Sequence, residues 1–253
     1  MFDQPLFLDE SEAHLWYFQT NRFSYGAVPK AMHYLDEQER QRYTRLLNPL
    51  RRHQFVMGRA LLKQVLACYL RCSAEAILLF YTEQQKPFVD ADLTFNISHS
   101  GQHVLIGVAR RALGVDIQEE AAITRAHVLH GLSVQERHKI CQDTLFRYWV
   151  LKEALWKADN QQTNIAPLLD AITTYPIQEP YPTFFPVGSW SMGYLNLGQN
   201  LHMGWAVDHP QPVWKLNGKL LETDALSFGG LPRMMQNSIY HHYFRPVSLS
   251  QRF

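Results

Sequence analysis

Helix-type and strand-type segments alternate twice along this chain, and that order constrains the fold more than any other feature of the sequence. Residues 50–70 carry apolar side chains at spacings of three and four, which predicts a long helix with one inward face. Short strand-type runs follow it, and a second helical segment, near residues 143–159, is again followed by strand-type runs. The order predicts an α+β protein of two α+β halves that join near residues 113–120.

Local signals place the ends of several segments. Asn48 followed by Pro49 predicts an N-cap and the first residue of the long helix. The S-V-Q-E run at 133–136 predicts a capping box, Asp143 is expected to cap the next helix, and Asn160 is expected to end it in the left-handed conformation. The S-H-S-G run at 98–101 is expected to form a turn. The predicted strands are 77–82, 93–97, 103–109, 114–117, 189–196 and 202–207, and no element is predicted beyond residue 210.

Charge and composition exclude several classes of protein. The 253 residues carry 24 Lys and Arg against 23 Asp and Glu, so the net charge is +1 and no basic excess indicates nucleic-acid binding. Apolar residues make up 46% and charged residues 19%, which is the mix of a globular chain and not of a disordered one. Three cysteines without a C-x-x-C pair cannot form a disulfide framework, so they predict reduced thiols and a reducing compartment.

The sequence carries no signal for export or for membrane insertion. Its start lacks the basic segment and the apolar run of a signal peptide. The longest apolar run, residues 76–81, is far shorter than the ~20 residues that a membrane-spanning helix needs. We therefore expect a soluble, cytoplasmic protein that acts without a membrane.

The segment 114–120, G-V-D-I-Q-E-E, is the first of three that could carry chemistry. In a strand, Asp116, Gln118 and Glu120 lie on one face, and the apolar side chains between them lie on the other. An acid beside buried apolar residues is costly unless it is paired or binds a cation. The alternative is the end of a strand followed by a solvated acidic loop.

The segment 146–157, F-R-Y-W-V-L-K-E-A-L-W-K, is the second. On a helix, Glu153 and Lys157 lie at i and i+4 and face the same way, while Trp149 lies one turn before Glu153. A carboxylate beside such an aromatic, partly desolvated surface could hold a metal ion or act as a general base. The alternative is an ordinary surface ion pair, which contributes about a few tenths of a kcal/mol.

The third comprises Lys86 with Pro87 and the F-N-I-S-H-S-G run at 95–101. A lysine, a hydroxyl, a histidine and turn amides can together bind phosphate oxygens. The alternative is a hairpin turn with a hydrogen-bonded histidine. A hydrolase triad of Ser98, His99 and Asp116 is disfavoured. The chain has no G-x-S-x-G elbow, and a serine is poorly placed to be activated by the histidine next to it in sequence.

Taken in order, these segments resemble the motifs of the 4′-phosphopantetheinyl transferases of the large, monomeric, two-half class (the Sfp-like class). The family patterns are approximately R-R-x-x-F-x-x-x-R, G-K-P-[FY], N-[IL]-S-H-S, G-[IV]-D-[IV]-E and W-x-x-K-E-A-x-x-K. The matching segments here are R-R-H-Q-F-V-M-G-R at 51–59, K-P-F at 86–88, N-I-S-H-S at 96–100, G-V-D-I at 114–117 and W-V-L-K-E-A-L-W-K at 149–157. With Trp190 and residues 202–207, which resemble the closing strands of the family, the similarity covers about residues 35–207.

The resemblance implies a fold and an activity. In this family, two similar α+β subdomains pack as a pseudo-dimer with the cofactor between them. Here, residues 1–113 would form the N-terminal subdomain, which grips coenzyme A, and residues 114–253 the C-terminal subdomain, with the metal and catalytic residues. Such enzymes act as monomers on an apo acyl or peptidyl carrier protein. They transfer the 4′-phosphopantetheine arm of coenzyme A to its serine, release 3′,5′-ADP and use Mg²⁺, the hard cation that suits phosphate chemistry.

The matching positions imply the roles of individual residues. Asp116 and Glu153 would hold Mg²⁺, and the amide of Gln118 would be a further ligand or hold a bound water. Glu153 would also be the general base, and Lys157 would stabilise the diphosphate. Lys152 is given a lesser role beside the phosphates, because the helix turns it away from the face of Glu153. The residues implied in binding coenzyme A are Arg51, Arg59, Lys86, Ser98 and His99.

The chain departs from the family at three positions. Gln118 replaces the second acid of the motif, which removes a negative charge and should weaken metal binding. Glu120, two residues further along the strand, is a less suitable substitute. Gln85 and Asn160 stand where the family has glycine, and we expect only conformational adjustments there. Two alternatives stay open: a catalytically impaired coenzyme A-binding module of the same fold, which Gln118 motivates, and a different metal-dependent phosphate enzyme such as a hydrolase.

Overall fold

The computed structural model describes residues 6–160, 167–168, 171, 183–198, 200–209 and 212–217. The helices in these ranges are α1 (Val28–Ala31), α2 (Glu37–Arg45), α3 (Pro49–Leu70), α4 (Arg125–His130), α5 (Val134–Lys139) and α6 (Leu145–Ala158). The strands are β1 (Glu12–Gln19), β2 (Phe80–Tyr81), β3 (Pro87–Phe88), β4 (Thr94–Ser100), β5 (His103–Ala109), β6 (Leu113–Glu119), β7 (Thr183–Val187), β8 (Trp190–Asn196), β9 (Leu201–Val207) and β10 (Val213–Asn217). None of these helices has both the length and the apolar character needed to cross a membrane.

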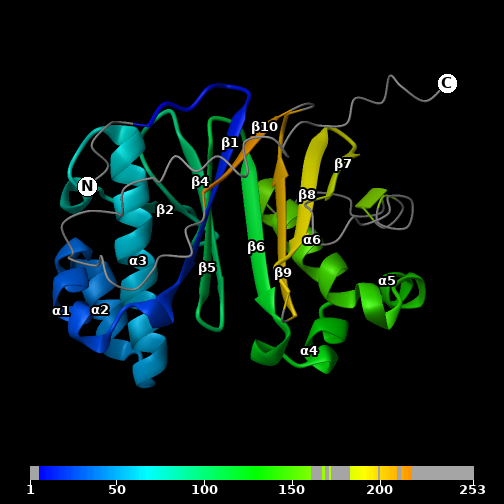
Figure 1. Ribbon diagram of the computed structural model, residues 1–253, viewed down its shortest axis with the longest axis horizontal. Helices are drawn as coiled ribbons and strands as arrows, with labels where there is room; N and C mark the ends of the chain where they lie inside the picture. Colours follow the sequence, from blue (N-terminus) through cyan, green and yellow to red (C-terminus); the bar gives the residue numbers. More distant parts are fainter. Residues whose placement is uncertain are drawn as a thin grey trace.

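Two four-stranded sheets form the centre of the molecule, and a long helix packs against each of them (Figure 1). The first sheet has the order β10-β1-β5-β4, and the second has the order β6-β9-β8-β7. Three apolar clusters join the layers: one between α3 and the first sheet, one between the two sheets, and one between α6 and the second sheet. Burial of these apolar faces is the main driving force for this arrangement.

The two halves share one topology. In the first half, β1, α3, β4 and β5 follow one another, and the sheet order is β1-β5-β4; in the second, β6, α6, β8 and β9 give the order β6-β9-β8. All these neighbouring strands are antiparallel. The predicted α+β fold of two similar subdomains is therefore confirmed. Strand β10, in the segment where the sequence predicts no element, returns to the first sheet and pairs in parallel with β1.

Most predicted strands are confirmed in place. Strand β5 has the predicted bounds, and the segments 93–97, 114–117, 189–196 and 202–207 overlap β4, β6, β8 and β9. The predicted strand 77–82 is reduced to the two residues of β2, which pair only with the short β3. An isolated two-stranded ribbon gains little from pairing, so few of these residues keep strand geometry.

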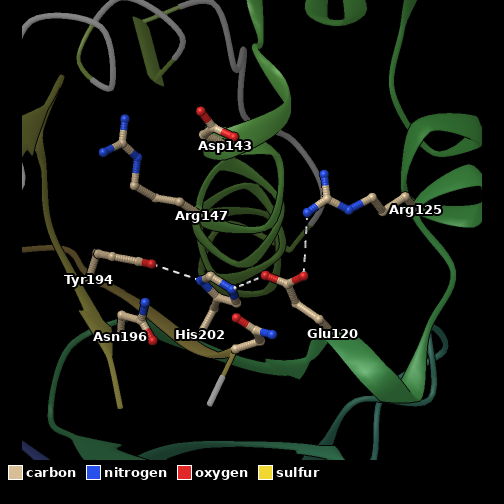
Figure 2. Close-up of a pocket in the computed structure, with 8 residues that line it drawn as sticks. Glu120, Arg125, Asp143, Arg147, Tyr194, Asn196 and His202 are labelled. Carbon is tan, nitrogen blue, oxygen red and sulfur yellow. Dashed lines mark hydrogen bonds and ion pairs between the residues drawn. The ribbon is translucent and has the colours of Figure 1, made fainter. Parts of the chain in front are cut away.

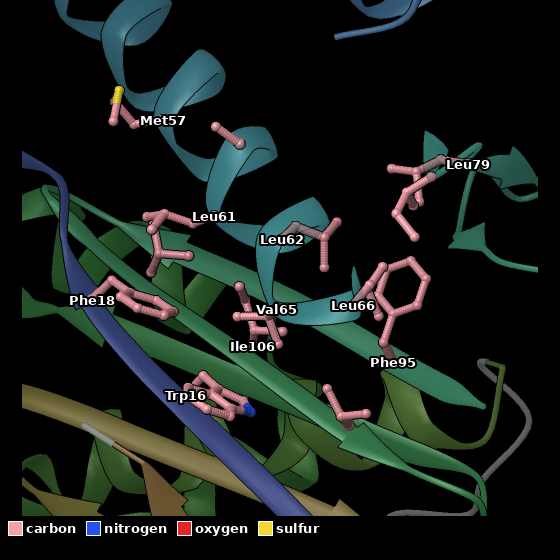
Figure 3. Close-up of a cluster of buried hydrophobic side chains, with 14 of the residues drawn as sticks. Trp16, Phe18, Met57, Leu61, Leu62, Val65, Leu66, Leu79, Phe95 and Ile106 are labelled. Carbon is pink, nitrogen blue, oxygen red and sulfur yellow. The ribbon is translucent and has the colours of Figure 1, made fainter. Parts of the chain in front are cut away.

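Helix α3 confirms the predicted long helix and its start. Asn48 is the N-cap, because its Oδ1 accepts hydrogen bonds from the backbone N–H groups of Leu50 (2.9 Å) and Arg51 (3.2 Å). The helix ends at Arg71, whose backbone is left-handed with a φ of 55°. Figure 3 shows the inner face of α3 against the first sheet, where its aliphatic side chains meet Trp16, Phe18 and Phe95.

Helix α6 differs from the prediction at its start and agrees with it at its end. It begins at Leu145 after a 3-10 turn, and its N-cap is Thr144, whose side chain accepts no bond from the first turn of the helix, so the predicted cap by Asp143 is wrong. Asn160 has a φ of 49°, which confirms the left-handed residue after the helix. The predicted capping box is also confirmed, since the side chains of Ser133 and Glu136 each accept the other's backbone N–H.

Strand β4 corrects the prediction of a turn at 98–101. Residues 98–100 are the end of β4, and the turn begins only at Gly101. Alternate side chains of β4 accept hydrogen bonds from the backbone of β6 in the second sheet. The three bonds run from Val115 N to Asn96 Oδ1 (2.9 Å), from Ile117 N to Ser98 Oγ (3.3 Å) and from Glu119 N to Ser100 Oγ (3.0 Å). The polar residues therefore satisfy a strand edge that would otherwise lack partners.

Candidate active site

The three segments that could carry chemistry all contribute residues to the lining of one cavity of about 280 Å³. It lies where the end of β4, strand β6 and helix α6 come together. Its lining residues are Ile97, Ser98, His99, Asp116, Ile117, Gln118, Ile123, Trp149, Glu153 and Lys157. Both proposed catalytic carboxylates and the proposed catalytic lysine thus face a common space.

Asp116 is a buried carboxylate, with 5% of its surface exposed. Its Oδ1 accepts hydrogen bonds from Ser98 Oγ (2.7 Å) and from the ammonium of Lys157 (2.5 Å). A buried acid needs such partners, because desolvation of an unpaired charge is expensive. The alternative of a solvated acidic loop does not describe this residue.

Glu153 is half-buried and makes no hydrogen bond within the described part of the chain. Lys157 bonds to Asp116 and not to Glu153, its i−4 neighbour. The two residues thus do not form the surface ion pair that was the alternative. Burial raises the pKa of the Glu153 carboxyl; the charge of Asp116 adds to that effect, and Lys157 and Lys152 oppose it. A desolvated carboxylate without a protein partner is suited to hold a cation or to accept a proton.

Two glycines let α6 approach the second sheet closely enough to build this cavity. A Cβ at Gly114 of β6 would lie 2.0 Å from the backbone oxygen of Ala154, and one at Gly204 of β9 would lie 2.7 Å from the backbone of Val150. Any side chain at Gly114 would push the helix outwards. The glycine of the G-V-D-I segment thus sets the separation between Asp116 and the residues of α6.

His99 and Arg59 bring an imidazole and a guanidinium of the first half towards the cavity. The His99 side chain is exposed at the cavity, yet the protein around its ring lowers its pKa, and Lys157 and Arg59 lower it further. The Nε of Arg59, in α3, lies 3.5 Å from Oε1 of Glu39, and its guanidinium lies over the ring of Phe55. Together with Ser98, which lines the cavity, these two residues are the proposed coenzyme A contacts that lie at or near it.

Arg51 and Lys86 lie outside the lining of the cavity. Arg51 is exposed in the first turn of α3. The Lys86 ammonium donates to the backbone oxygen of Lys157 (2.7 Å) and to Asn160 Oδ1 (3.2 Å), and burial lowers its pKa. Lys86 therefore satisfies the carboxyl end of α6. The residue before it, Gln85, has a φ of 62°, in keeping with the expected adjustment where the family has glycine.

Lys152 is placed away from the cavity, as the helix geometry predicts. Its ammonium is buried and donates to both carboxylate oxygens of Glu136 (2.9 and 3.2 Å) and to the backbone oxygen of Gly131 (3.0 Å). These partners occupy the cation, so the expected role beside the phosphates finds no support in this placement. From the sequence, Glu136 is expected only to take part in the capping box at the start of α5, so its pairing with Lys152 is not predicted.

Glu120 faces a second, larger hollow of about 580 Å³, shown in Figure 2. Its Oε1 lies 2.9 Å from His202 Nε2, and its Oε2 lies 3.5 Å from Arg125. His202 in turn shares a hydrogen bond of 2.8 Å with the hydroxyl of Tyr194. Glu120 is thus held by other partners, which agrees with the expectation that it does not replace the missing second acid.

The donor set fits a magnesium ion that also binds substrate phosphates. No group of three or more His, Cys, Asp or Glu side chains suited to a metal occurs in the described ranges. Mg²⁺ is usually held by one or two carboxylates, with waters and phosphate oxygens in the other positions. Gln118 donates its amide protons to Ser100 Oγ and to the backbone oxygen of Glu119 (2.8 Å each), which leaves its amide oxygen for a ligand.

Comparison with known proteins agrees with this geometry. Residues 24–110 match the family model described as "4'-phosphopantetheinyl transferase, N-terminal". The chain is 28% identical over 131 residues to 4'-phosphopantetheinyl transferase gsp of Aneurinibacillus migulanus, a match that covers 49% of this chain and 55% of the relative. It is 29% identical over 172 residues to 4'-phosphopantetheinyl transferase HetI of a Nostoc species, covering 60% of this chain and 70% of the relative.

A third relative is a phosphopantetheinyl transferase of a Thraustochytrium species, 30% identical over 149 residues. That match covers 49% of this chain and 52% of the relative. The chain therefore spans about half the length of two of these relatives.

Proposed function

We propose that this chain, which by these similarities belongs with the 4′-phosphopantetheinyl transferases, transfers the phosphopantetheine arm of coenzyme A to a carrier protein. The acceptor is a serine of an apo acyl or peptidyl carrier, and the second product is 3′,5′-ADP. One observation carries the proposal: Asp116, Glu153 and Lys157 line a common cavity beside the N-I-S-H-S segment. We also propose a monomer, as the family resemblance implies. The three free cysteines favour a reducing, cytoplasmic setting.

The reaction is an attack of the serine oxygen on the β-phosphorus of coenzyme A. A bond forms between that oxygen and the phosphorus, the bond from the phosphorus to the bridging oxygen breaks, and 3′,5′-ADP leaves with the electron pair. Glu153 takes the hydroxyl proton, directly or through a water, because it is the lining carboxylate that has no hydrogen bond to the described residues. The Lys157 cation, 2.5 Å from Asp116, lies where it can stabilise the charge of the diphosphate.

In this proposal, Asp116 and Glu153 hold Mg²⁺, with the amide oxygen of Gln118 as a further ligand or as the holder of a bound water. When bound, Mg²⁺ would neutralise negative charge on the diphosphate. Ser98 keeps the carboxylate of Asp116 oriented through its hydroxyl. His99 and Arg59 contact the nucleotide end of coenzyme A, with Arg51 and Lys86 as outer cations.

The test is the mass of an apo carrier after incubation with the protein, coenzyme A and Mg²⁺. A gain equal to one phosphopantetheine arm on the carrier serine, with release of 3′,5′-ADP, is expected for at least one member of a panel of carriers. Binding of coenzyme A without any mass gain would support a catalytically impaired binding module instead. Release of 3′,5′-ADP without a carrier would support a hydrolase.

Gln118→Glu restores the acid that the family motif carries and is expected to keep activity. The added charge should lower the Mg²⁺ concentration for half-maximal activity about 3- to 10-fold, because metal affinity rises with ligand charge. A Mg²⁺ titration of transfer measures this, with Gln118→Met as the control of similar size without a ligand atom. An unchanged titration in Gln118→Glu would show that position 118 lies outside the metal shell.

A further inference from the structure

A six-residue pattern, L-x-x-Q-E-R, occurs at Leu35–Arg40 and again at Leu132–Arg137. Each copy starts a short helix with a capping box, α2 in the first half and α5 in the second. In each copy, the arginine Nε donates to the backbone oxygen of the leucine, at 2.9 Å in both cases. The same capped helix, with the same arginine hydrogen bond, thus occurs once in each half.

Each copy ends in a buried ion pair with the long helix of its own half. A carboxylate oxygen of Glu39 lies 2.8 Å from the ammonium of Lys63 of α3, and one of Glu136 lies 2.9 Å from the ammonium of Lys152 of α6. The exposed fractions are 2% for both glutamates, 1% for Lys63 and 8% for Lys152. We call these pairs the Glu39–Lys63 tie and the Glu136–Lys152 tie.

The ties align the two long helices residue by residue. With Lys63 set against Lys152, Arg59 falls opposite Tyr148, and both contact the glutamate of their tie: Arg59 Nε at 3.5 Å, and Tyr148 through a hydrogen bond of 2.5 Å from its hydroxyl. The same alignment sets Gln64 against Glu153 and Cys68 against Lys157. Only the tie of the second half therefore lies on a helix that carries the catalytic groups.

The Glu136–Lys152 tie also reaches the wall of the cavity. Lys152 donates to the backbone oxygen of Gly131, and a Cβ at Gly131 would lie 2.7 Å from the ring of Trp149. Trp149 lines the cavity beside Glu153. The bonds of Lys152 thus hold α6 in its rotation about the helix axis. Glu153, the next residue, faces the cavity on the other side of the helix.

Resting on the proposed function, we propose that the Glu136–Lys152 tie positions Glu153 for the reaction, whereas the Glu39–Lys63 tie stabilises the first half without orienting a catalytic group. Lys152 is in this sense a positioning residue, because it lies outside the lining of the cavity and acts through the backbone of α6. The duplicated ties provide their own control, since both are buried ion pairs with the same chemistry.

The experiment compares Lys152→Met with Lys63→Met by steady-state transfer kinetics, at a temperature well below the melting point of both variants. Both are expected to melt at lower temperature than the wild type, because each removes the lysine partner of a buried glutamate. Lys152→Met should lose about 10- to 100-fold in kcat with little change in KM for coenzyme A, as expected when reacting groups are misplaced. Lys63→Met should keep kcat within about twofold at saturating coenzyme A.

Two further measurements separate positioning from stability. Hydrogen exchange of the α6 backbone amides should be faster in Lys152→Met and unchanged in Lys63→Met, a result that does not depend on turnover. In the double variant Lys152→Met/Glu136→Gln, the melting temperature should rise again, because the unpaired charge is gone, while kcat stays low.

Three outcomes would overturn the inference: equal losses of kcat in both lysine variants, wild-type kcat in Lys152→Met, or recovery of kcat together with melting temperature in the double variant. A wild-type protein that modifies none of the carriers would instead contradict the proposed function, so the two failures are distinguishable.

Discussion

Glu153→Gln is expected to lower the rate of phosphopantetheine transfer by about 10³-fold or more, since general bases typically contribute 10²- to 10⁴-fold and this residue is also proposed to hold the metal. The amide keeps the size of the side chain but can neither take a proton nor supply a negative charge. Because Glu153 makes no hydrogen bond in the described part of the protein, the substitution breaks no hydrogen bond there. Transfer is measured as the mass gain of the apo carrier over time.

The control for this variant is Glu120→Gln, the same substitution at a carboxylate that faces the neighbouring hollow of Figure 2. It should keep kcat within a few-fold. Coenzyme A binding, measured by calorimetry, should be largely retained in both variants. If Glu153→Gln turned over at the wild-type rate, Glu153 would have no part in the mechanism.

Gly114→Ala is expected to destabilise the fold by about 3 kcal/mol, at the upper end of what overpacking costs. The new methyl would lie 2.0 Å from the backbone oxygen of Ala154 and 2.5 Å from the backbone nitrogen of Ala158. Backbone atoms cannot rotate away as a side chain would, so α6 must move away from β6. Such movement also separates Asp116 from Glu153 and Lys157, so we expect transfer to fall even where the variant is folded. Urea denaturation gives the free energy of unfolding.

Gly58→Ala is the matched control. Gly58 lies inside α3, and the nearest atom to a methyl group added there would be a flexible side-chain carbon of Val104 at 4.0 Å. Since alanine favours a helix interior by up to about 1 kcal/mol over glycine, this variant should be as stable as the wild type or more so. A neutral Gly114→Ala would contradict the close approach of α6 and β6.

The parts of the fold that local chemistry determines could be predicted from the sequence. The cap at Asn48, the left-handed Asn160 and strand β5 all follow from signals within a few residues. The segment at 98–100 could not be predicted this way, because its two serines and the glycine that follows it favour turns locally. Its period-two placement of polar groups makes sense only beside the unpaired edge of β6, which lies in the other sheet.

The site shows the same division. Helix geometry correctly turns Lys152 away from Glu153, but the partner of Lys152 is a glutamate from another helix, and adjacency cannot reveal it. The signal that could have found it is the repeated L-x-x-Q-E-R pattern, which pairs Glu136 with Glu39. Asp143 failed as a cap because a 3-10 turn precedes α6, so the helix begins two residues after it.

The central claim is that one carboxylate from β6 and one from α6 share a divalent cation. Crystals grown with coenzyme A and Mn²⁺, a substitute for Mg²⁺ with a measurable anomalous signal, test it most directly. We predict one anomalous peak in the cavity, about 2.0–2.5 Å from an oxygen of Asp116 and from an oxygen of Glu153. A peak bound to neither side chain, or to only one of them, beside well-ordered coenzyme A would contradict the account.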